Sequence, residues 1–78
     1  MNLKILKLTG SIYDGYADSI NLKSESGELT ILNDHKPLIT TIIKGIIHIK
    51  TEKSEKNINL ENGFLIIRPK SEVTILTN

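Results

Sequence analysis

A chain of 78 residues with a formal net charge of +1 and no cysteine has room for one domain, and it can contain neither a disulfide nor a thiolate metal site. Its Lys and Arg residues are scattered, and two tyrosines and one phenylalanine offer few surfaces for stacking on bases, so nucleic-acid binding is not expected. No apolar run approaches the roughly 20 residues of a membrane-spanning helix, and the start is too polar for a secretory signal. The expectation is one soluble domain over residues 1–78, with no segment inserted into a membrane.

The first apolar run, Leu3–Leu8, alternates with lysines and predicts a strand. Its alternation breaks between Ile5 and Leu6. Such a break indicates either a β-bulge or burial on both faces of the strand, and the sequence leaves both explanations open.

Five later segments alternate apolar and polar residues with a period of two, which is typical of strands with one buried face. Their apolar pairs are, in chain order, Ile20 and Leu22, Leu29 and Ile31, Ile47 and Ile49, Ile58 and Leu60, and Val73 and Ile75. Isoleucine dominates the apolar residues, and β-branched side chains pack well on a pleated surface. The best candidate for a helix, Leu38–Lys44, is short and rich in Thr and Ile, so a strand is predicted there too.

Turn signals separate these runs, since glycine supplies a positive φ and proline a fixed one. They are Thr9-Gly10, Asp14-Gly15, Ser26-Gly27, Lys44-Gly45, Asn62-Gly63 and Arg68-Pro69. The charged stretch Glu52–Lys56 predicts a hairpin tip between strands over Gly45–Thr51 and Asn57–Glu61. The prediction is an all-β fold, a small β-sandwich or flattened barrel of about 8–10 short, mostly antiparallel strands.

The two histidines do not indicate catalysis or metal binding. His35 follows Asp34 and could suggest a general base, but a working site also needs a nucleophile or electrophile placed by a third group. A metal site needs several converging ligands, and the carboxylates here are dispersed. His48, on the polar side of its strand, is expected to face solvent or an interface. No catalytic residue, cofactor, metal or small-molecule substrate is predicted.

The segment Gly27–Gly45 reads GELTILNDHKPLITTIIKG. It has two apolar runs, one on each side of the polar stretch Asn33–Pro37, and it ends in glycine. It resembles the signature loop of the epsilon subunit of F-type ATP synthases, where a short strand, a turn, His-x-Pro-Leu and a second strand follow in this order. Three further segments are similar to the same family in order and spacing, namely Thr9–Ile20, Gly63–Ile67 and Glu72–Leu76. The resemblance covers essentially the whole chain.

The chain departs from this family at three positions within Gly27–Gly45 and in its length. Glycine is usual where Thr30 stands, and proline then glycine where Asn33 and Asp34 stand, although Asn and Asp also tolerate turn geometries. Most members continue into a two-helix C-terminal domain that binds nucleotide or restrains hydrolysis, whereas this sequence stops at Asn78. The resemblance therefore implies the β-sandwich domain only, with the helical domain absent.

In function, the resemblance implies a non-catalytic rotor subunit in the central stalk of a proton- or sodium-translocating ATP synthase. Such a subunit joins the gamma subunit to the ring of c subunits and supports the coupling of ion translocation to ATP synthesis. It is peripheral, on the cytoplasmic face of the inner (cell) membrane as part of the complex. The alternative is a free-standing small β-sandwich that binds a ligand or a protein, because a fold alone does not assign function.

The resemblance also implies two sets of contact residues. In the family, the signature loop faces basic polar loops of the c-ring, so c-ring contacts are expected from Glu25, Gly27, Glu28, Asn33 and Asp34. Contacts with the gamma subunit are expected from Tyr13, His35, Lys36, Pro37, Thr40 and Thr41. Simpler explanations remain open, with Glu25 and Glu28 as solvated turn charges and Pro37 as a rigid entry to a strand.

Overall fold

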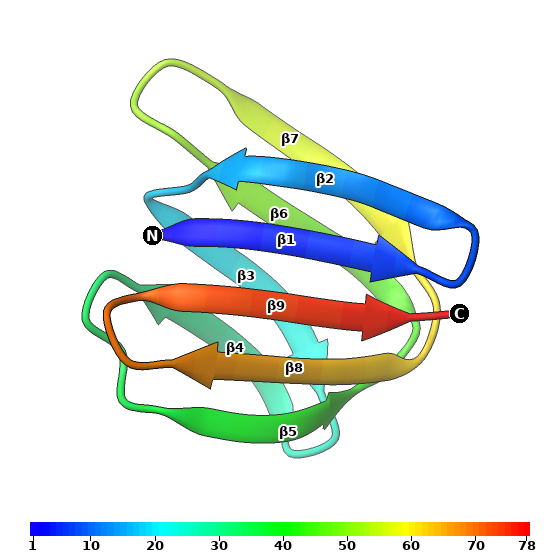
Figure 1. Ribbon diagram of the computed structural model, residues 1–78. Coiled ribbons are helices and arrows are strands. Elements are labelled where there is room, and N and C mark those ends of the chain that lie inside the picture. Colours follow the sequence, from blue (N-terminus) through cyan, green and yellow to red (C-terminus); the bar gives the residue numbers. More distant parts are fainter.

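The computed structural model describes all residues 1–78 and contains nine strands and no helix (Figure 1). The strands are β1 (Asn2–Lys7), β2 (Gly10–Tyr16), β3 (Ser19–Ser24), β4 (Gly27–Leu32), β5 (Leu38–Ile42), β6 (Gly45–Lys50), β7 (Glu55–Leu60), β8 (Gly63–Arg68) and β9 (Glu72–Thr77). The predicted all-β fold is confirmed, and so is the strand predicted at Leu38–Lys44.

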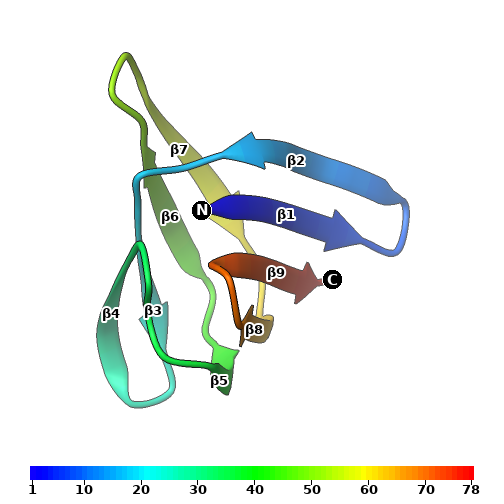
Figure 2. The same cartoon turned by 60° about the vertical axis from the view of Figure 1, so that its left-hand side comes forward.

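The strands form two layers that pack face to face (Figures 1 and 2). The first layer has the order β2-β1-β9-β8-β5, and the second has the order β4-β3-β6-β7. A single pair, Ser24 with Ile42, joins β3 to β5 at one corner, so the sheet turns from one layer into the other there. All neighbouring strands are antiparallel except β1 and β9, the first and last strands of the chain, which run parallel.

The core lies between the two layers and consists of one cluster of fifteen buried apolar side chains. The largest fully buried members are Leu3, Ile5, Ile20, Ile31, Ile47, Ile49, Leu65 and Ile75. Every strand segment predicted from a period of two contributes to this cluster or packs against it. Full burial of one such side chain is worth about 1.5–3 kcal/mol, so this cluster is the main source of stability.

The broken alternation in the first strand coincides with a β-bulge. Ile5 lies opposite Tyr13 across β1 and β2, whereas Leu6 lies opposite Ser11, so β2 carries one extra residue, Ile12. Ile5 is buried in the core, and Leu6 is half-buried on the other side of the strand.

Two local predictions are wrong. Asp14 and Gly15 form no turn, because both lie inside β2 opposite Lys4 and Leu3. The Tyr13 ring folds back over Gly15, and its hydroxyl oxygen lies 3.5 Å from the position of an added Cβ, which is ordinary van der Waals contact. The second error is the hairpin tip, which is shorter than Glu52–Lys56 because β7 begins at Glu55, whose carboxylate lies 3.4 Å from the Lys50 ammonium.

Candidate interaction surface

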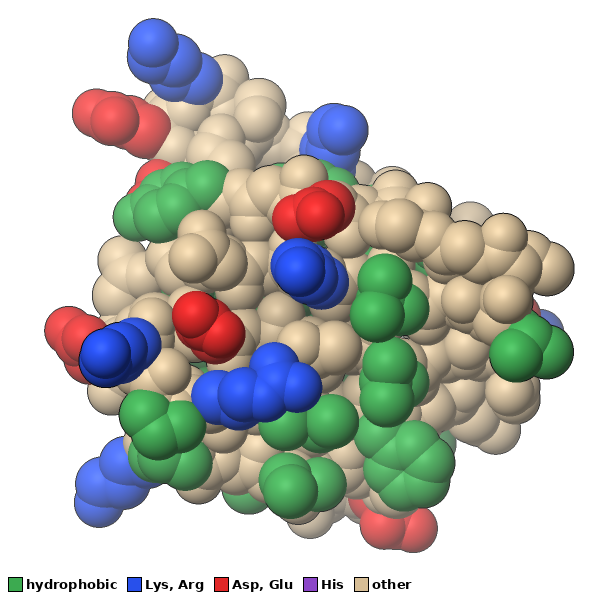
Figure 3. Space-filling view, viewed as in Figure 1, with side chains coloured by type: hydrophobic (Ala, Val, Ile, Leu, Met, Phe, Trp, Pro, Cys, Tyr) green, Lys and Arg blue, Asp and Glu red, His purple; other side chains and the backbone are tan.

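The outer face of the β2-β1-β9-β8-β5 layer carries contiguous apolar side chains. Leu6, Leu76 and Phe64 are cross-strand neighbours on β1, β9 and β8, and these three residues are called the apolar row. Phe64 is 53% exposed and Leu76 is 40% exposed. Figure 3 shows hydrophobic side chains gathered over the right-hand ends of these three strands.

The apolar row continues toward β5, the edge strand of this layer. Thr41 on β5 is the cross-strand neighbour of Phe64, and Ile39 pairs with Ile66 of β8 two residues along. Ile39 is 74% exposed and Ile66 is half-buried. Contiguous exposed apolar side chains, unlike single ones, are typical of a surface that another molecule covers.

The other half of the same face is charged. Lys4 lies opposite Asp14, and Arg68 lies opposite Glu72, so each cation has an acidic cross-strand neighbour. The Arg68 guanidinium donates a hydrogen bond to Thr74 Oγ1 at 2.9 Å. These charges border a shallow hollow of about 520 Å³, and Figure 3 shows both signs of charge beside the hydrophobic side chains. An apolar centre with a mixed charged border is the usual anatomy of a protein interface.

The outer face of the β4-β3-β6-β7 layer is different, because its polar side chains bond to one another. Thr30, Asn21, His48 and Asn57 are cross-strand neighbours over all four strands. Asn21 Nδ2 donates to Thr30 Oγ1 at 2.9 Å, and His48 Nδ1 lies 2.7 Å from Asn57 Oδ1. His48 is exposed, as expected. This face also exposes Ile46 and Leu32, but they lie at opposite ends of it, so it has no contiguous apolar row.

The residues expected to contact the c-ring lie at two places. Glu25, Gly27 and Glu28 form the turn between β3 and β4 and the first residues of β4, and all three are exposed. Asn33 and Asp34 follow the other end of β4. Four strand residues, Leu29–Leu32, separate the two groups. Glu28 and Asn33 are therefore about 17 Å apart along the strand, at about 3.3 Å per residue.

Asn33 and Asp34 lie beside the β8–β9 turn and the start of the chain. Asn33 Oδ1 accepts a hydrogen bond from the Met1 nitrogen at 2.7 Å, and the Asp34 N–H donates to Ser71 Oγ at 2.9 Å. His35 follows, half-buried, with its Nδ1 2.8 Å from the Lys36 carbonyl oxygen.

The residues expected to contact the gamma subunit surround the first layer rather than forming one patch. Lys36 and Pro37 are exposed before β5, and Thr41 lies near its other end. Thr40 is half-buried beside the buried Leu65. Tyr13, on β2 at the opposite edge, is half-buried against the core, and the Lys56 ammonium lies 5.6 Å from its ring centroid.

One residue expected to contact the c-ring is hydrogen-bonded to one residue expected to contact the gamma subunit. Thr41 Oγ1 donates a hydrogen bond of 2.7 Å to Glu25 Oε2, so the β3–β4 turn is held against the end of β5. Glu28 is held separately, because its Oε1 accepts from Asn21 Nδ2 at 3.0 Å.

The apolar row itself was not predicted. One usable signal is the contiguous run Phe64-Leu65-Ile66-Ile67, in which both faces of the strand are apolar. The other is Leu6, the residue at which the first alternation breaks. Neither signal brings the three residues together, because they lie on β1, β8 and β9.

The arrangement offers binding surfaces on both layers. No three His, Cys, Asp or Glu side chains lie close enough together to hold a metal ion. The chain also has no helix that is long and apolar enough to cross a membrane.

Comparison with known sequences gives a consistent relationship. Residues 1–78 match the family described as the beta-sandwich domain of the ATP synthase Delta/Epsilon chain. The ATP synthase epsilon chain of Alkalihalophilus pseudofirmus is 33% identical over 76 residues, which make up 97% of this chain and 56% of that protein. The chloroplastic ATP synthase epsilon chain of Pylaiella littoralis is 37% identical over 76 residues, or 97% of this chain and 57% of that protein. The chain therefore spans a little over half the length of these curated relatives.

Solved structures show the same fold at low sequence identity. One similar chain is in the mitochondrial ATP synthase of Euglena gracilis, in an assembly of OSCP, F1 and c-ring. Its TM-score is 0.88 at 19% sequence identity, and the matched region makes up 96% of this chain and 48% of that one. A chain in the central stalk and c-ring structure of the Tetrahymena thermophila mitochondrial ATP synthase has a TM-score of 0.79 at 15% identity. The matched region makes up 99% of this chain and 62% of that one.

Proposed function

The chain belongs to the family of ATP synthase delta and epsilon chains through their β-sandwich domain, and on this basis we propose that it is a non-catalytic subunit of the central stalk. In this proposal it joins the gamma subunit to the ring of c subunits and supports the coupling of ion translocation to ATP synthesis. It is peripheral to the membrane, on its cytoplasmic face, as part of the synthase.

The difference between the two outer faces supports this proposal most directly. The apolar row lies open on one face, while the polar side chains of the other face bond to one another. A stable protein interface buries about 800 Å² on each partner, with apolar residues at its centre and polar residues at its border. The outer face of the first layer has this composition, and we assign it to the gamma subunit.

We assign the two ends of β4 to different contacts, because about 17 Å separates them. Gly27 and Glu28, at the β3–β4 turn, are placed against the c-ring, where Glu28 can pair with a basic loop. Asn33 and Asp34 were expected at the c-ring from the resemblance. We instead assign them, with the loop His35–Pro37, to the gamma side, since that loop leads into β5 at the edge of the apolar face. A rim ion pair adds little affinity and mainly sets orientation.

Binding to the purified gamma subunit and c-ring tests the proposal. The double variant Phe64→Asn, Leu76→Asn removes two exposed anchors, so its affinity for gamma should fall by about tenfold or more while the fold is kept. The matched double variant His48→Ala, Asn57→Ala changes the opposite face and should keep wild-type affinity. Equal loss in both variants would contradict the assignment of the faces. Failure of the unmodified chain to bind gamma or the c-ring would favour a free-standing binding module instead.

A further inference from the structure

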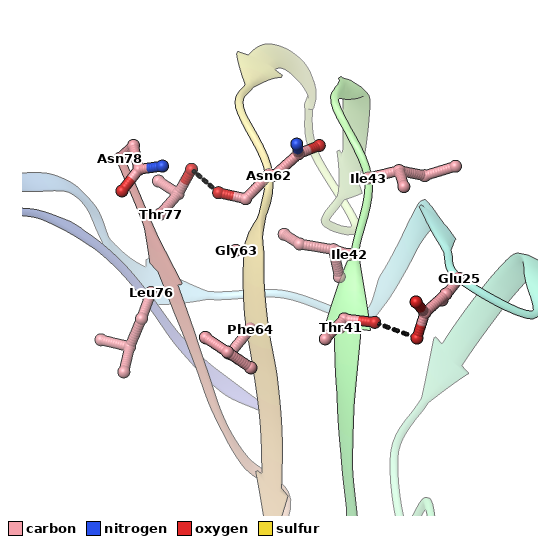
Figure 4. Close-up of a pocket in the computed structure, with 10 residues that line it drawn as sticks. All are labelled: Glu25, Thr41, Ile42, Ile43, Asn62, Gly63, Phe64, Leu76, Thr77 and Asn78. Carbon is pink, nitrogen blue, oxygen red and sulfur yellow. Dashed lines mark hydrogen bonds between the residues drawn. The ribbon is translucent and has the colours of Figure 1, made fainter.

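A groove lies where the apolar row meets the β3–β4 turn (Figure 4). It has a volume of about 450 Å³. Its ten lining residues come from the ends of β5 and β9, the start of β8 and the turn after β3, and they are Glu25, Thr41, Ile42, Ile43, Asn62, Gly63, Phe64, Leu76, Thr77 and Asn78.

The groove is mostly apolar and is held in shape by its backbone. Phe64, Leu76 and Ile43 are exposed, while Ile42 is only 3% exposed and belongs to the core. Gly63 keeps β8 close to β9, because a Cβ at this position would overlap the Leu76 carbonyl oxygen. The polar border is also fixed, since Asn62 Oδ1 accepts from the Lys44 N–H at 2.7 Å and the Thr77 hydroxyl donates to the Asn62 carbonyl oxygen at 3.2 Å.

Glu25 is the one charged side chain that lines the groove. Its Oε2 is held by the Thr41 hydroxyl at 2.7 Å, and its Oε1 takes part in no hydrogen bond of the chain. No lysine or arginine neutralises it, because the only ion pair within 4.0 Å joins Lys50 and Glu55. The groove thus presents a positioned carboxylate with a free oxygen.

A single side chain, that of Thr41, lies between the Glu25 carboxylate and the Phe64 ring. Thr41 is the cross-strand neighbour of Phe64 and bonds to Glu25, and Figure 4 shows Thr41 between the other two. Adjacent strands are about 4.8 Å apart, so a side chain of arginine length can cover Phe64 with its stem and reach Glu25 with its head.

We propose that this groove binds an arginine side chain of a partner polypeptide. The aliphatic stem packs on Phe64 and Ile43, and the guanidinium donates to the free Oε1 of Glu25. Guanidinium suits the site better than ammonium, because it is planar, is more weakly hydrated and favours contact with an aromatic face. Glu25 is then a specificity-determining residue that selects a basic side chain next to the apolar contacts. The inference rests on the proposed function only in taking the partner to be a polypeptide of the rotor.

Two small probes of the same shape test the site on the intact chain. N-butylguanidinium carries the stem and head of arginine, and N-butylurea is its uncharged counterpart. Titration of the chain, followed through the amide signals of Thr41, Gly63 and Phe64, should show saturable shifts in the millimolar range with butylguanidinium, and about tenfold weaker binding of butylurea.

Matched variants decide the outcome. Glu25→Gln keeps an oxygen acceptor for Thr41 but should make the two probes bind equally weakly, while Glu28→Gln, in the same hairpin, should leave the preference for butylguanidinium unchanged. Equal binding of both probes to the unmodified chain, a preference that survives Glu25→Gln, or no saturable shift at these three amides would overturn the inference. The titration contains no gamma or c subunit, so its result is independent of the binding test of the proposed function.

Discussion

The backbone N–H of Asp34 donates a hydrogen bond to Ser71 Oγ at 2.9 Å, although 37 residues separate the two in sequence. Both residues have a left-handed backbone, with φ of 66° at Asp34 and 56° at Ser71, and so does Lys70, with φ of 67°. These are the only residues other than glycine with positive φ. The contact therefore joins two strained turns, one leading to β5 and the other joining β8 to β9.

Two substitutions at Ser71 separate the hydrogen bond from the backbone strain. Ser71→Ala removes the acceptor and keeps the strain, so the free energy of unfolding should fall by about 0.5–1 kcal/mol. Ser71→Gly loses the same bond but relieves about 1–2 kcal/mol of left-handed strain. The greater freedom of glycine in the unfolded chain lowers stability by about 0.5–1 kcal/mol. Urea unfolding should therefore place Ser71→Gly within about 0.5 kcal/mol of wild type and above Ser71→Ala. The reverse order would show that the turn carries no strain.

Two glycines that each open a strand after a turn should respond differently to alanine. A Cβ on Gly63 would overlap the Leu76 carbonyl oxygen and lie 2.9 Å from the Thr77 Cα, so β8 and β9 would have to separate. Gly63→Ala should lower the free energy of unfolding by about 3 kcal/mol, at the upper end of overpacking effects.

Gly45→Ala is the matched control. The nearest atom to an added Cβ there is the Ile43 carbonyl oxygen at 3.9 Å, which is ordinary contact. Its free energy of unfolding should stay within about 0.5 kcal/mol of wild type. Similar thermal midpoints for the two variants would mean that β8 and β9 can move apart at little cost.

The period of two identified most of the core, because each predicted strand has one side facing the other layer. Its failure at Asp14-Gly15 has a local cause. In sequence, a glycine after aspartate indicates a turn, but glycine also occurs inside a strand beneath an aromatic ring, as Gly15 does beneath Tyr13. The tyrosine and glycine alone do not decide between the two structures.

The interaction surface was harder to predict than the fold, since it depends on pairing between distant strands. Leu6 meets Leu76 only because β1 and β9, at opposite ends of the chain, run parallel side by side. The resemblance pointed to two sets of contact residues, and the structure shows Glu25 of the β3–β4 turn and Thr41 of β5, one from each set, in contact. Alternation along one strand carries no information about which strand lies beside it.

Reversing the charge at Glu28 tests the proposed contact with the c-ring. Glu28 is exposed at the β3–β4 turn, so Glu28→Arg should leave the fold intact and place like charge against the basic loops expected on the ring. Membranes that carry this variant should pump fewer ions for each ATP hydrolysed, measured by a pH-sensitive dye together with phosphate release. Glu55→Arg, on the outer edge of the second layer, is the matched control and should pump normally. Pumping that is unchanged in Glu28→Arg would remove this residue from the ring contact.

A double-mutant cycle at Tyr13 and Gly15 measures how much the Tyr13 ring, which lies over Gly15, contributes to the stability of the strand at that glycine. The Tyr13 hydroxyl donates to the Tyr16 carbonyl oxygen at 3.0 Å, which holds the ring over Gly15. Tyr13→Ala should lower the free energy of unfolding by about 1–2 kcal/mol, because it exposes the β2 backbone and removes a partly buried ring. Gly15→Ala should have little effect in the wild type, where the ring lies at van der Waals distance from the added methyl. In the Tyr13→Ala background the same change should raise stability by about 0.5–1 kcal/mol, since alanine is better than glycine in an uncovered strand. Additive effects of the two substitutions in urea unfolding would show that the ring does not protect the glycine.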